Sequence, residues 1–179
     1  MSTYSAPVQV HVPCNLCGGR QATVVATRSR SGAPMRSVAC TGCGLVWADP
    51  RPHDARQFYE EDYRVAYKNT FTPRAKHVLR AGRVAQDRLR RIQGLLQAPR
   101  AVLDVGSGGG EFAYLLQTRG HAVVGVEPNR GYGDYARNEY GLDIRRGFIG
   151  DVELAPQAFD LVTIWHVLEH TEDPGAVLR

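Results

Sequence analysis

Four cysteines have the residue type and spacing of a metal site. They form two Cys-x-x-Cys pairs, Cys14 with Cys17 and Cys40 with Cys43, and a glycine follows each pair. Thiolates at this spacing typically hold one tetrahedral zinc ion, since each short turn presents two sulfur ligands. Local disulfides and a thioredoxin-like redox pair are the alternatives. Disulfides are not favoured because the sequence looks cytoplasmic, and a redox pair is not favoured because neither pair lies in a strand–helix–strand context. The spacing therefore predicts one closed, structural zinc site.

A second group of residues could bind a small ligand at a sharp turn of the backbone. Its pattern is Asp-x-Gly-x-Gly-x-Gly, and the residues are Asp104, Gly106, Ser107, Gly108 and Gly110. Glycines let the main chain turn and approach a ligand closely. A dinucleotide fingerprint needs a third glycine where Glu111 stands, so a nicotinamide cofactor does not fit. The carboxylate of Asp104 would repel a pyrophosphate and suits a ligand that carries an amino group.

One more carboxylate belongs with this turn. Glu127 closes the next apolar run and stands twenty-one residues after Gly106. That is the distance at which an acidic side chain accepts hydrogen bonds from ribose hydroxyls in nucleotide-binding α/β proteins. The pattern therefore indicates a ligand with both an amino group and a ribose.

Three polar residues near the C-terminus could move a proton or bind a metal. His166, Glu169 and His170 are spaced i, i+3 and i+4, which predicts one shared face of a helix. His-x-x-Glu-His is also the inverted zinc-protease motif, but here it follows directly on a strand instead of lying in a long helix. Histidine has an ordinary pKa of about 6.5 and can remove a proton at neutral pH. We take His166 as the candidate base and His170 as the second; for Glu169 and His170, helix capping and packing is the alternative.

The apolar pattern predicts the strands and helices that carry these residues. Strands are expected over 101–105, 122–127, 143–146 and 159–164, with helices between them, and this alternation predicts a parallel sheet covered by helices on both faces. A single helix is expected over 74–100, and a β-hairpin over 22–39 between the cysteine pairs. The fold class is therefore α/β, a Rossmann-like parallel sheet preceded by a small zinc-ribbon β domain and a linking helix. The predicted domains are 1–50, the ribbon; 51–73, an aromatic linker or lid with Tyr63 or Tyr67 closing over the ligand; and 74–179.

Composition narrows the class of protein further. The 179 residues are 43% hydrophobic and 22% charged, which is typical of a globular protein. Neither a signal peptide nor a membrane-spanning run is visible, so we expect a cytoplasmic location and no membrane partner. The net charge is +4, yet residues 74–100 alone carry eight Lys or Arg against one Asp. This basic helix is either a solvated face or a contact for a phosphate-bearing acceptor or RNA.

These motifs together resemble the class I S-adenosylmethionine-dependent methyltransferases. The glycine loop is similar to the first motif of that family, and FDLVTIWHVLEHTEDP is similar to the segment after its fourth strand. The resemblance implies that the loop holds the methionine part of S-adenosylmethionine, that Glu127 grips the ribose, and that Phe148 borders the adenine. The CxxCG ribbon with ADPRP and FYEEDY resembles a subgroup that methylates sugars, glycans and other small metabolites. Related ubiquinone-pathway and small-RNA enzymes bind a divalent metal through Glu-x-x-Glu-His, and this chain has His166 in place of the first glutamate.

The resulting prediction is methyl transfer to a small-molecule acceptor such as a sugar, sugar nucleotide or glycan precursor, on oxygen or carbon. The alternatives are an RNA methyltransferase, although nucleic acid is the less favoured partner, and a non-catalytic cofactor-binding or regulatory module. The family sheet has the order 3-2-1-4-5-7-6, and this sequence supplies strands 3-2-1-4. We therefore expect a fragment of a longer enzyme, inactive by itself, which self-associates through the exposed edge of its fourth strand.

Overall fold

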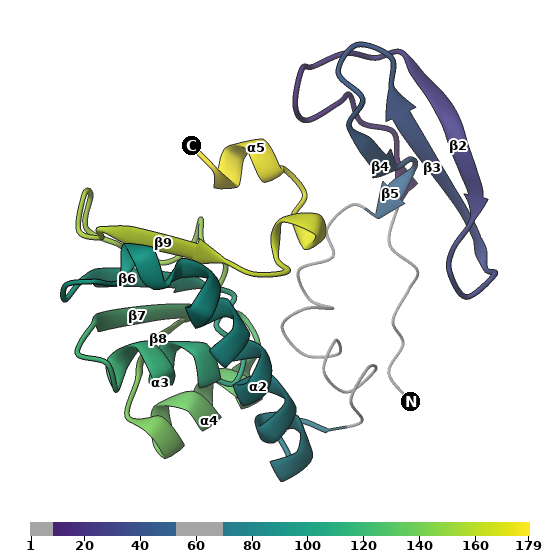
Figure 1. The fold of residues 1–179 in the computed structure, drawn as a ribbon. Coiled ribbons are helices and arrows are strands. Elements are labelled where there is room, and N and C mark those ends of the chain that lie inside the picture. The colour runs from purple at the N-terminus through teal and green to yellow at the C-terminus, as the bar shows by residue number, and fades with distance from the viewer. Residues whose placement is uncertain (1–8, 53–69) are drawn as a thin grey trace. The chain divides into compact units, whose positions relative to one another are not determined.

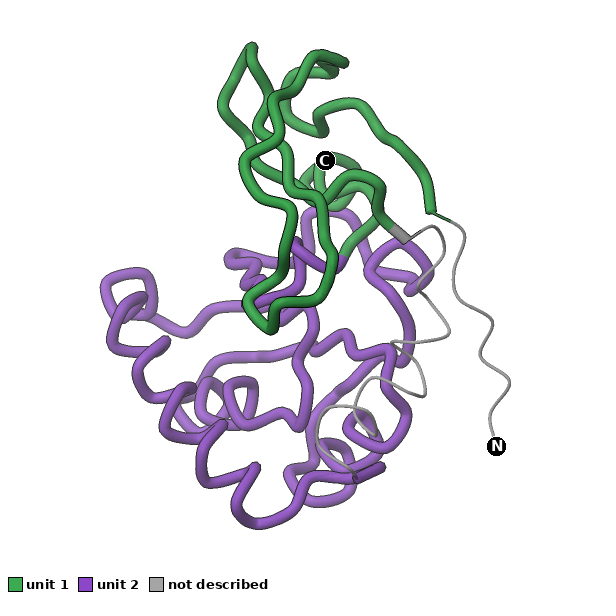
Figure 2. Tube along the Cα trace, turned by 90° about the vertical axis from the view of Figure 1, so that its right-hand side faces the viewer, with its two compact units in different colours: residues 1–55, 171–179 green, residues 56–170 purple. Residues whose placement is uncertain are grey.

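The computed structural model describes residues 9–52 and 70–179, which belong to two compact units. Residues 1–55 and 171–179 form the first unit, and residues 56–170 form the second (Figure 2). The aromatic segment expected to act as a linker or lid, with Tyr63 and Tyr67, lies mostly outside the described residues. Within the described ranges, no helix combines the length and the apolar character needed to cross a bilayer.

The first unit is a small β structure. Its elements are β1 (Gln9–Val10), β2 (Ala22–Arg28), β3 (Pro34–Cys40), β4 (Val46–Ala48), β5 (Arg51–Pro52) and the short helix α5 (Pro174–Val177). β2, β3 and β4 form an antiparallel sheet in that order (Figure 1). β1 pairs with β5. The β2–β3 hairpin confirms the one expected between the cysteine pairs, with Ala22 opposite Cys40. The three-residue β4 was not predicted, because so short a run has no alternation to detect.

The second unit is a four-stranded parallel sheet with its helices. In chain order it contains α2 (Ala75–Ile92), η2 (Gln93–Leu95), β6 (Ala101–Val105), α3 (Glu111–Gln117), β7 (Ala122–Glu127), α4 (Arg130–Tyr140), β8 (Asp143–Arg146), β9 (Leu161–Ile164) and the 3₁₀ turn η3 (Leu168–His170). The strand order is β8-β7-β6-β9, and all three pairings are parallel. This confirms the predicted order 3-2-1-4.

The sheet is covered differently on its two faces. Val102 packs with Ala85 and Leu89 of α2 and with Phe112 and Leu116 of α3. The same face continues through α3 and α4 in a second cluster, formed by Ala113, Ala136, Leu142 and Ile144. The opposite face, formed by Leu103, Val105 and Val126, packs against side chains of the connection after β8, such as Ile149, Val152 and Phe159.

The expectation of helices on both faces is therefore wrong for the described part of the chain. Residues 147–160 join β8 to β9 through turns instead of a helix, and their apolar side chains cover the second face. The single helix expected over 74–100 is also shorter. It ends at Ile92 and continues as η2 around Gly94, because glycine is a poor helix former.

Candidate functional site

The four cysteine sulfurs converge in the first unit. Each Sγ lies within 4.8 Å of the other three. The Sγ atoms of Cys14 and Cys43 are 3.4 Å apart and those of Cys17 and Cys40 are 3.5 Å apart, and all four cysteines are free thiols. These distances exceed a disulfide bond of about 2.05 Å. They approach the edge of about 3.8 Å that a tetrahedron with Zn–S bonds of about 2.3 Å would have. The donor set therefore fits a tetrahedral zinc ion.

The backbone around the two cysteine pairs is alike. Gly18 N donates to the carbonyl of Cys14 at 2.8 Å, and Gly44 N donates to the carbonyl of Cys40 at 2.9 Å. Both glycines have a left-handed φ, 72° and 79°, which explains why a glycine follows each pair. Amide donors of Cys43 and Gly42 outweigh the effect of burial and lower the pKa of the Cys40 thiol to about 7, whereas contact with the other three sulfurs helps to raise the pKa of Cys43. A thiol that is readily deprotonated at neutral pH is suited to ligate a metal.

The glycine-rich turn lies between β6 and α3, as predicted. Gly106 N and Ser107 N both donate to the carbonyl of Val126 on β7, at 2.8 Å and 3.0 Å, so the turn is tied to the neighbouring strand. Gly106 has a φ of 74°, and a Cβ added there would lie 2.2 Å from Val167 Cγ2. Gly110 has a φ of 85°, and its Cβ would lie 2.7 Å from Ala136 Cβ. Conformation and packing therefore both require glycine at these two positions.

The carboxylate of Glu127 lies beside this turn. It comes from the carboxyl end of β7 and is 4% exposed. Gly108 N donates to its Oε2 at 2.7 Å, and Asn129 N donates to its Oε1 at 3.1 Å. Asn129 was not predicted as part of the site, although an Asn directly before a helix is a recognisable N-cap. Its side chain accepts from Tyr132 N at the start of α4. The structure thus brings Glu127 and the glycine turn together, as their spacing predicted.

Asp104 is the second buried carboxylate of the site. It is 3% exposed on β6, opposite Thr163 of β9, and Thr163 Oγ1 donates to its Oδ1 at 2.8 Å. Burial raises the pKa of Asp104 to about 7, against the opposing effects of the Thr163 hydrogen bond and the Arg88 charge, and Glu127 raises it further. A buried acid whose pKa is near 7, with a second carboxylate nearby, is suited to bind a cationic group.

Arg88 and Trp165 meet near Asp104, and neither was predicted from the sequence. Arg88 belongs to α2, and its Cζ lies 5.0 Å from the centre of the Trp165 ring, which contacts Phe112 edge to face. Burial lowers the pKa of the Arg88 guanidinium, while the charges of Asp104 and Glu111 raise it. No spacing rule connects α2 to residue 165, because the two meet only once the helix packs on the sheet.

Phe148 and Ser107 are two further residues that were expected to contact the cofactor. Gly147 N donates to the carbonyl of Glu127 at 3.3 Å, so the half-buried Phe148 follows directly on a residue bonded to β7. Ser107 is 8% exposed, and its Oγ would lie 2.8 Å from a Cβ on Gly125, so its side chain packs against β7. Contacts of Phe148 and Ser107 with a cofactor remain predictions.

The two histidines lie in a different local structure from the expected helix. His166 has a left-handed φ of 57° and precedes η3, the short 3₁₀ turn that contains Glu169 and His170. Its side chain is 80% exposed, and its Nδ1 lies 3.3 Å from Glu169 Oε1. Val167, the next residue, packs against Gly106, which places this segment beside the glycine turn. The i, i+3 contact is thus present although no regular helix carries it.

Comparison with known proteins assigns the second part of the chain. A family model described as "Methyltransferase domain" matches residues 76–179, more than half of the sequence. The ubiquinone biosynthesis O-methyltransferase of Pseudomonas entomophila is 35% identical over 88 residues, which are 46% of this chain and 38% of that protein. The enzyme of the same name from Hahella chejuensis is 36% identical over 83 residues, 43% of this chain and 35% of that protein. The chain thus spans well under half the length of these curated relatives.

Solved structures give lower similarity. A S-adenosylmethionine-dependent methyltransferase from Thermotoga maritima is 23% identical over 51% of this chain and 41% of its own, with a TM-score of 0.42. The YcgJ protein of Bacillus subtilis is 22% identical over 49% of this chain and 41% of its own, with a TM-score of 0.43. The family model carries the assignment, and the sheet order and glycine turn agree with it. The chain therefore belongs to the class I S-adenosylmethionine-dependent methyltransferases.

Proposed function

We propose that the protein transfers a methyl group from S-adenosylmethionine to an oxygen atom of a small-molecule acceptor. The observation that supports this most directly is the buried carboxylate of Glu127, held against the glycine turn by the amides of Gly108 and Asn129. The curated relatives are named O-methyltransferases, which favours oxygen over carbon as the acceptor atom.

Different residues of the second unit would bind different parts of the cofactor. Asp104 suits the amino group of the methionine part, since a buried acid gains most from a cationic partner. The glycine turn allows the cofactor close to the main chain, Glu127 accepts from the ribose hydroxyls, and Phe148 packs against the adenine. When bound, S-adenosylmethionine supplies an electrophilic methyl group on a sulfonium, so alignment of the acceptor is the main task left to the protein.

His166 is the residue that we propose as the base. A neutral acceptor hydroxyl must lose its proton, and an exposed imidazole can take it. With Nδ1–H donating to Glu169, the unprotonated nitrogen is Nε2, and this atom would accept the proton. Glu169 then orients the ring and stabilises its charged form. His170 is the alternative base from the same turn.

The acceptor that we propose is a sugar, sugar nucleotide or glycan precursor. The support is the resemblance of the cysteine ribbon and its flanking sequence to methyltransferases of such molecules. The names of the curated relatives give a second candidate, an intermediate of ubiquinone biosynthesis. In the first unit, we propose that Cys14, Cys17, Cys40 and Cys43 hold one structural zinc ion, because their sulfurs already approach tetrahedral spacing.

Cofactor binding tests the proposal without knowledge of the acceptor. Calorimetry should show binding of S-adenosylhomocysteine and no binding of NAD. Glu127→Ala should weaken S-adenosylhomocysteine binding by about 1.5–3 kcal/mol, through loss of charge-assisted hydrogen bonds. Glu139→Ala, which removes an exposed carboxylate from α4, is the matched control and should bind normally.

Two outcomes would contradict the proposal. One is binding of NAD with no binding of either methionine nucleotide. The other is an equal loss of affinity in Glu127→Ala and Glu139→Ala, which would mean that the β7 carboxylate has no specific contact. Where binding is confirmed, methyl transfer to a panel of sugar nucleotides and of ubiquinone precursors, assayed with the longest form of the protein, separates the two acceptor classes.

A further inference from the structure

The first unit has a pocket whose lining includes none of the residues proposed above for the cofactor, the base or the zinc ion. Its volume is about 300 Å³, and no cysteine of the metal cluster lines it. Four of its lining residues can carry charge, namely His11, Arg20, Arg36 and Asp49, and Pro13 and Trp47 contribute apolar surface. This volume is at the lower end of the range for small-ligand sites, about 300–1,000 Å³.

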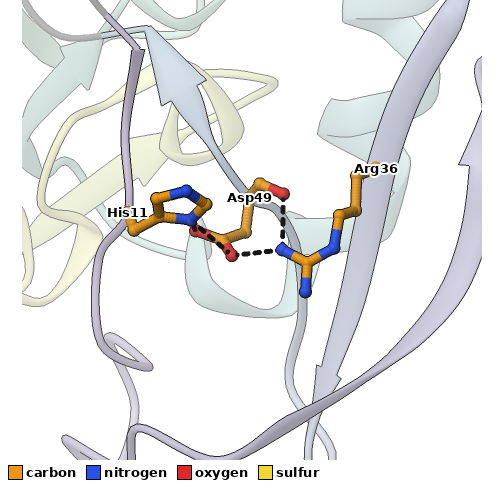
Figure 3. A network of polar contacts seen from close by, with 3 residues as sticks. All are labelled: His11, Arg36 and Asp49. Atoms are coloured by element: carbon orange, nitrogen blue, oxygen red, sulfur yellow. Dashed lines mark hydrogen bonds and ion pairs between the residues drawn. The ribbon is translucent and has the colours of Figure 1, made fainter.

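Asp49 organises the polar side of the pocket. Figure 3 shows its carboxylate between His11, which follows β1, and Arg36 of β3. His11 Nδ1 lies 3.0 Å from both carboxylate oxygens. Arg36 Nη1 donates to Asp49 Oδ2 at 2.7 Å and to the Asp49 carbonyl at 3.1 Å. Although partial burial opposes it, contact with His11 and Arg36 holds the pKa of Asp49 below its ordinary value, so this carboxylate is ionised at neutral pH.

Hydrogen-bond donors outnumber acceptors in this pocket. Both oxygens of Asp49 already have partners, and Arg36 uses only Nη1 for them, so its other guanidinium nitrogens have no acceptor among the described residues. Arg20 likewise has no hydrogen bond or ion pair within residues 9–52 and 70–179. Two guanidinium groups therefore line the pocket with one carboxylate, and the net charge of the lining is positive whether or not His11 is protonated.

The guanidinium groups and apolar rings of this lining indicate what kind of ligand would fit. Guanidinium groups bind phosphate through paired N–H donors, more strongly than neutral donors do. The ring of Trp47 and the ring of Pro13 offer apolar surface on which a flat ring can pack. We propose that the pocket binds a nucleoside phosphate, with the phosphate on Arg20 and Arg36 and the base against Trp47.

The test is a titration of the whole chain with three probes. Saturating S-adenosylhomocysteine is present throughout, so that the cofactor site of the second unit is filled. Uridine diphosphate should bind best, ribose 5-phosphate should bind more weakly because it lacks the flat ring and one of the two phosphates, and inorganic phosphate should bind weakest. The chain has two tryptophans, so a Trp165→Phe background isolates the fluorescence of Trp47, which uridine diphosphate should quench.

Charge variants locate the site. Arg20→Ala should weaken uridine diphosphate binding about tenfold or more, as expected for loss of a charge-assisted contact. Arg30→Ala is the matched control, because Arg30 is an exposed arginine of the same unit, in the turn between β2 and β3, and does not line the pocket. Neither substitution removes a core side chain, so both variants should keep the circular dichroism spectrum of the parent.

Several results would overturn the inference. Equal losses in Arg20→Ala and Arg30→Ala would mean a diffuse electrostatic attraction instead of a pocket. Equal affinity for all three probes would mean that Trp47 makes no contact with the base. Absence of binding at millimolar uridine diphosphate, or binding of oligoribonucleotides alone, would refute a small-ligand site. None of these results depends on methyl transfer, so the cofactor assignment stands or fails separately.

Discussion

At the scale of single residues, the most consequential group is the carboxyl of Asp104. It is buried on β6, and its pKa of about 7 lies well above the value of about 3.9 expected in an unfolded chain. The folded state therefore binds the proton more tightly than the unfolded state. It follows that the stability contribution of this group falls as the pH rises from about 4 to about 7, and is constant above that range.

Asp104→Asn should therefore stabilise the protein at pH 8 and not at pH 4. The amide keeps an oxygen that can accept from Thr163 and cannot ionise, so the free energy of unfolding should rise by roughly 2–4 kcal/mol at pH 8. Denaturant unfolding at both pH values measures this. The same variant should bind S-adenosylhomocysteine more weakly, because its amino group loses an anionic partner.

Glu139→Gln is the control for that experiment, since it neutralises an exposed carboxylate on α4. It should leave stability within about 0.5 kcal/mol of the parent at both pH values. Equal destabilisation by Asp104→Asn at pH 4 and pH 8 would contradict the argument, because the effect would then come from packing and not from charge.

The carboxylates of the site could be predicted from the sequence, whereas their partners could not. Asp104 and Glu127 stand at fixed distances from a glycine turn, and those distances reflect local chain geometry. Thr163 lies fifty-nine residues after Asp104 in the chain, and the two residues meet because the register of β9 with β6 places them opposite each other. Arg88 depends on how α2 is rotated on the sheet. Contacts that are set by tertiary packing leave no local pattern to detect.

At the scale of elements, the strands agreed closely with the sequence pattern. β7 and β8 have the predicted bounds, and β9 begins at Leu161 instead of residue 159. The central strands β6 and β7 give nearly continuous apolar runs, which are easily recognised, whereas β8 has Ile144 as its one buried residue. The helices agreed less well, because Gly94 shortens α2 and because turns replace a helix between β8 and β9. The 3₁₀ geometry at Glu169 could not be predicted, because i, i+3 spacing fits both an α-helix and a 3₁₀-helix.

The two cysteine turns lead to a prediction for the first unit. Metal analysis of the purified protein should give about one zinc ion per chain, because four thiolates complete one tetrahedral site. Cys40→Ser should abolish zinc binding and unfold the β2–β3 hairpin. Hydrogen exchange should then show loss of protection over 22–40 and unchanged protection over 101–127.

The second unit serves as the internal control for that substitution. Loss of protection in β6 and β7 would mean that the metal site stabilises more than its own unit. A zinc-free protein that keeps the hairpin protected would contradict a structural role for the metal.

At the scale of the whole molecule, the parallel sheet has two edge strands, β8 and β9, and β9 is the apolar one. β9 pairs with β6 along one edge, and no second partner is present among residues 9–52 and 70–179. Val162 in this strand is 52% exposed. An apolar edge strand offers unpaired backbone groups to any other strand.

We expect this chain to self-associate through that edge. Sedimentation velocity should show a mass that rises with protein concentration, and Val162→Lys should weaken the association by about tenfold, since a lysine on an edge strand disfavours pairing. Leu79→Lys, which adds the same charge to an equally exposed apolar position on α2, should leave the association unchanged. A concentration-independent monomer, or an equal effect of both variants, would show that the edge does not mediate contact.

The sparse interior of the first unit has one more consequence. In its described part the buried apolar side chains are Val38 and two of the four cysteines, and nearly all of β2 is exposed. Such a small interior supplies little hydrophobic stabilisation. The four sulfur–metal bonds would therefore provide most of the folding free energy. Folding of this unit would then follow the concentration of free zinc, and zinc-depleted growth would yield protein whose second unit is native and whose first unit is open to proteases.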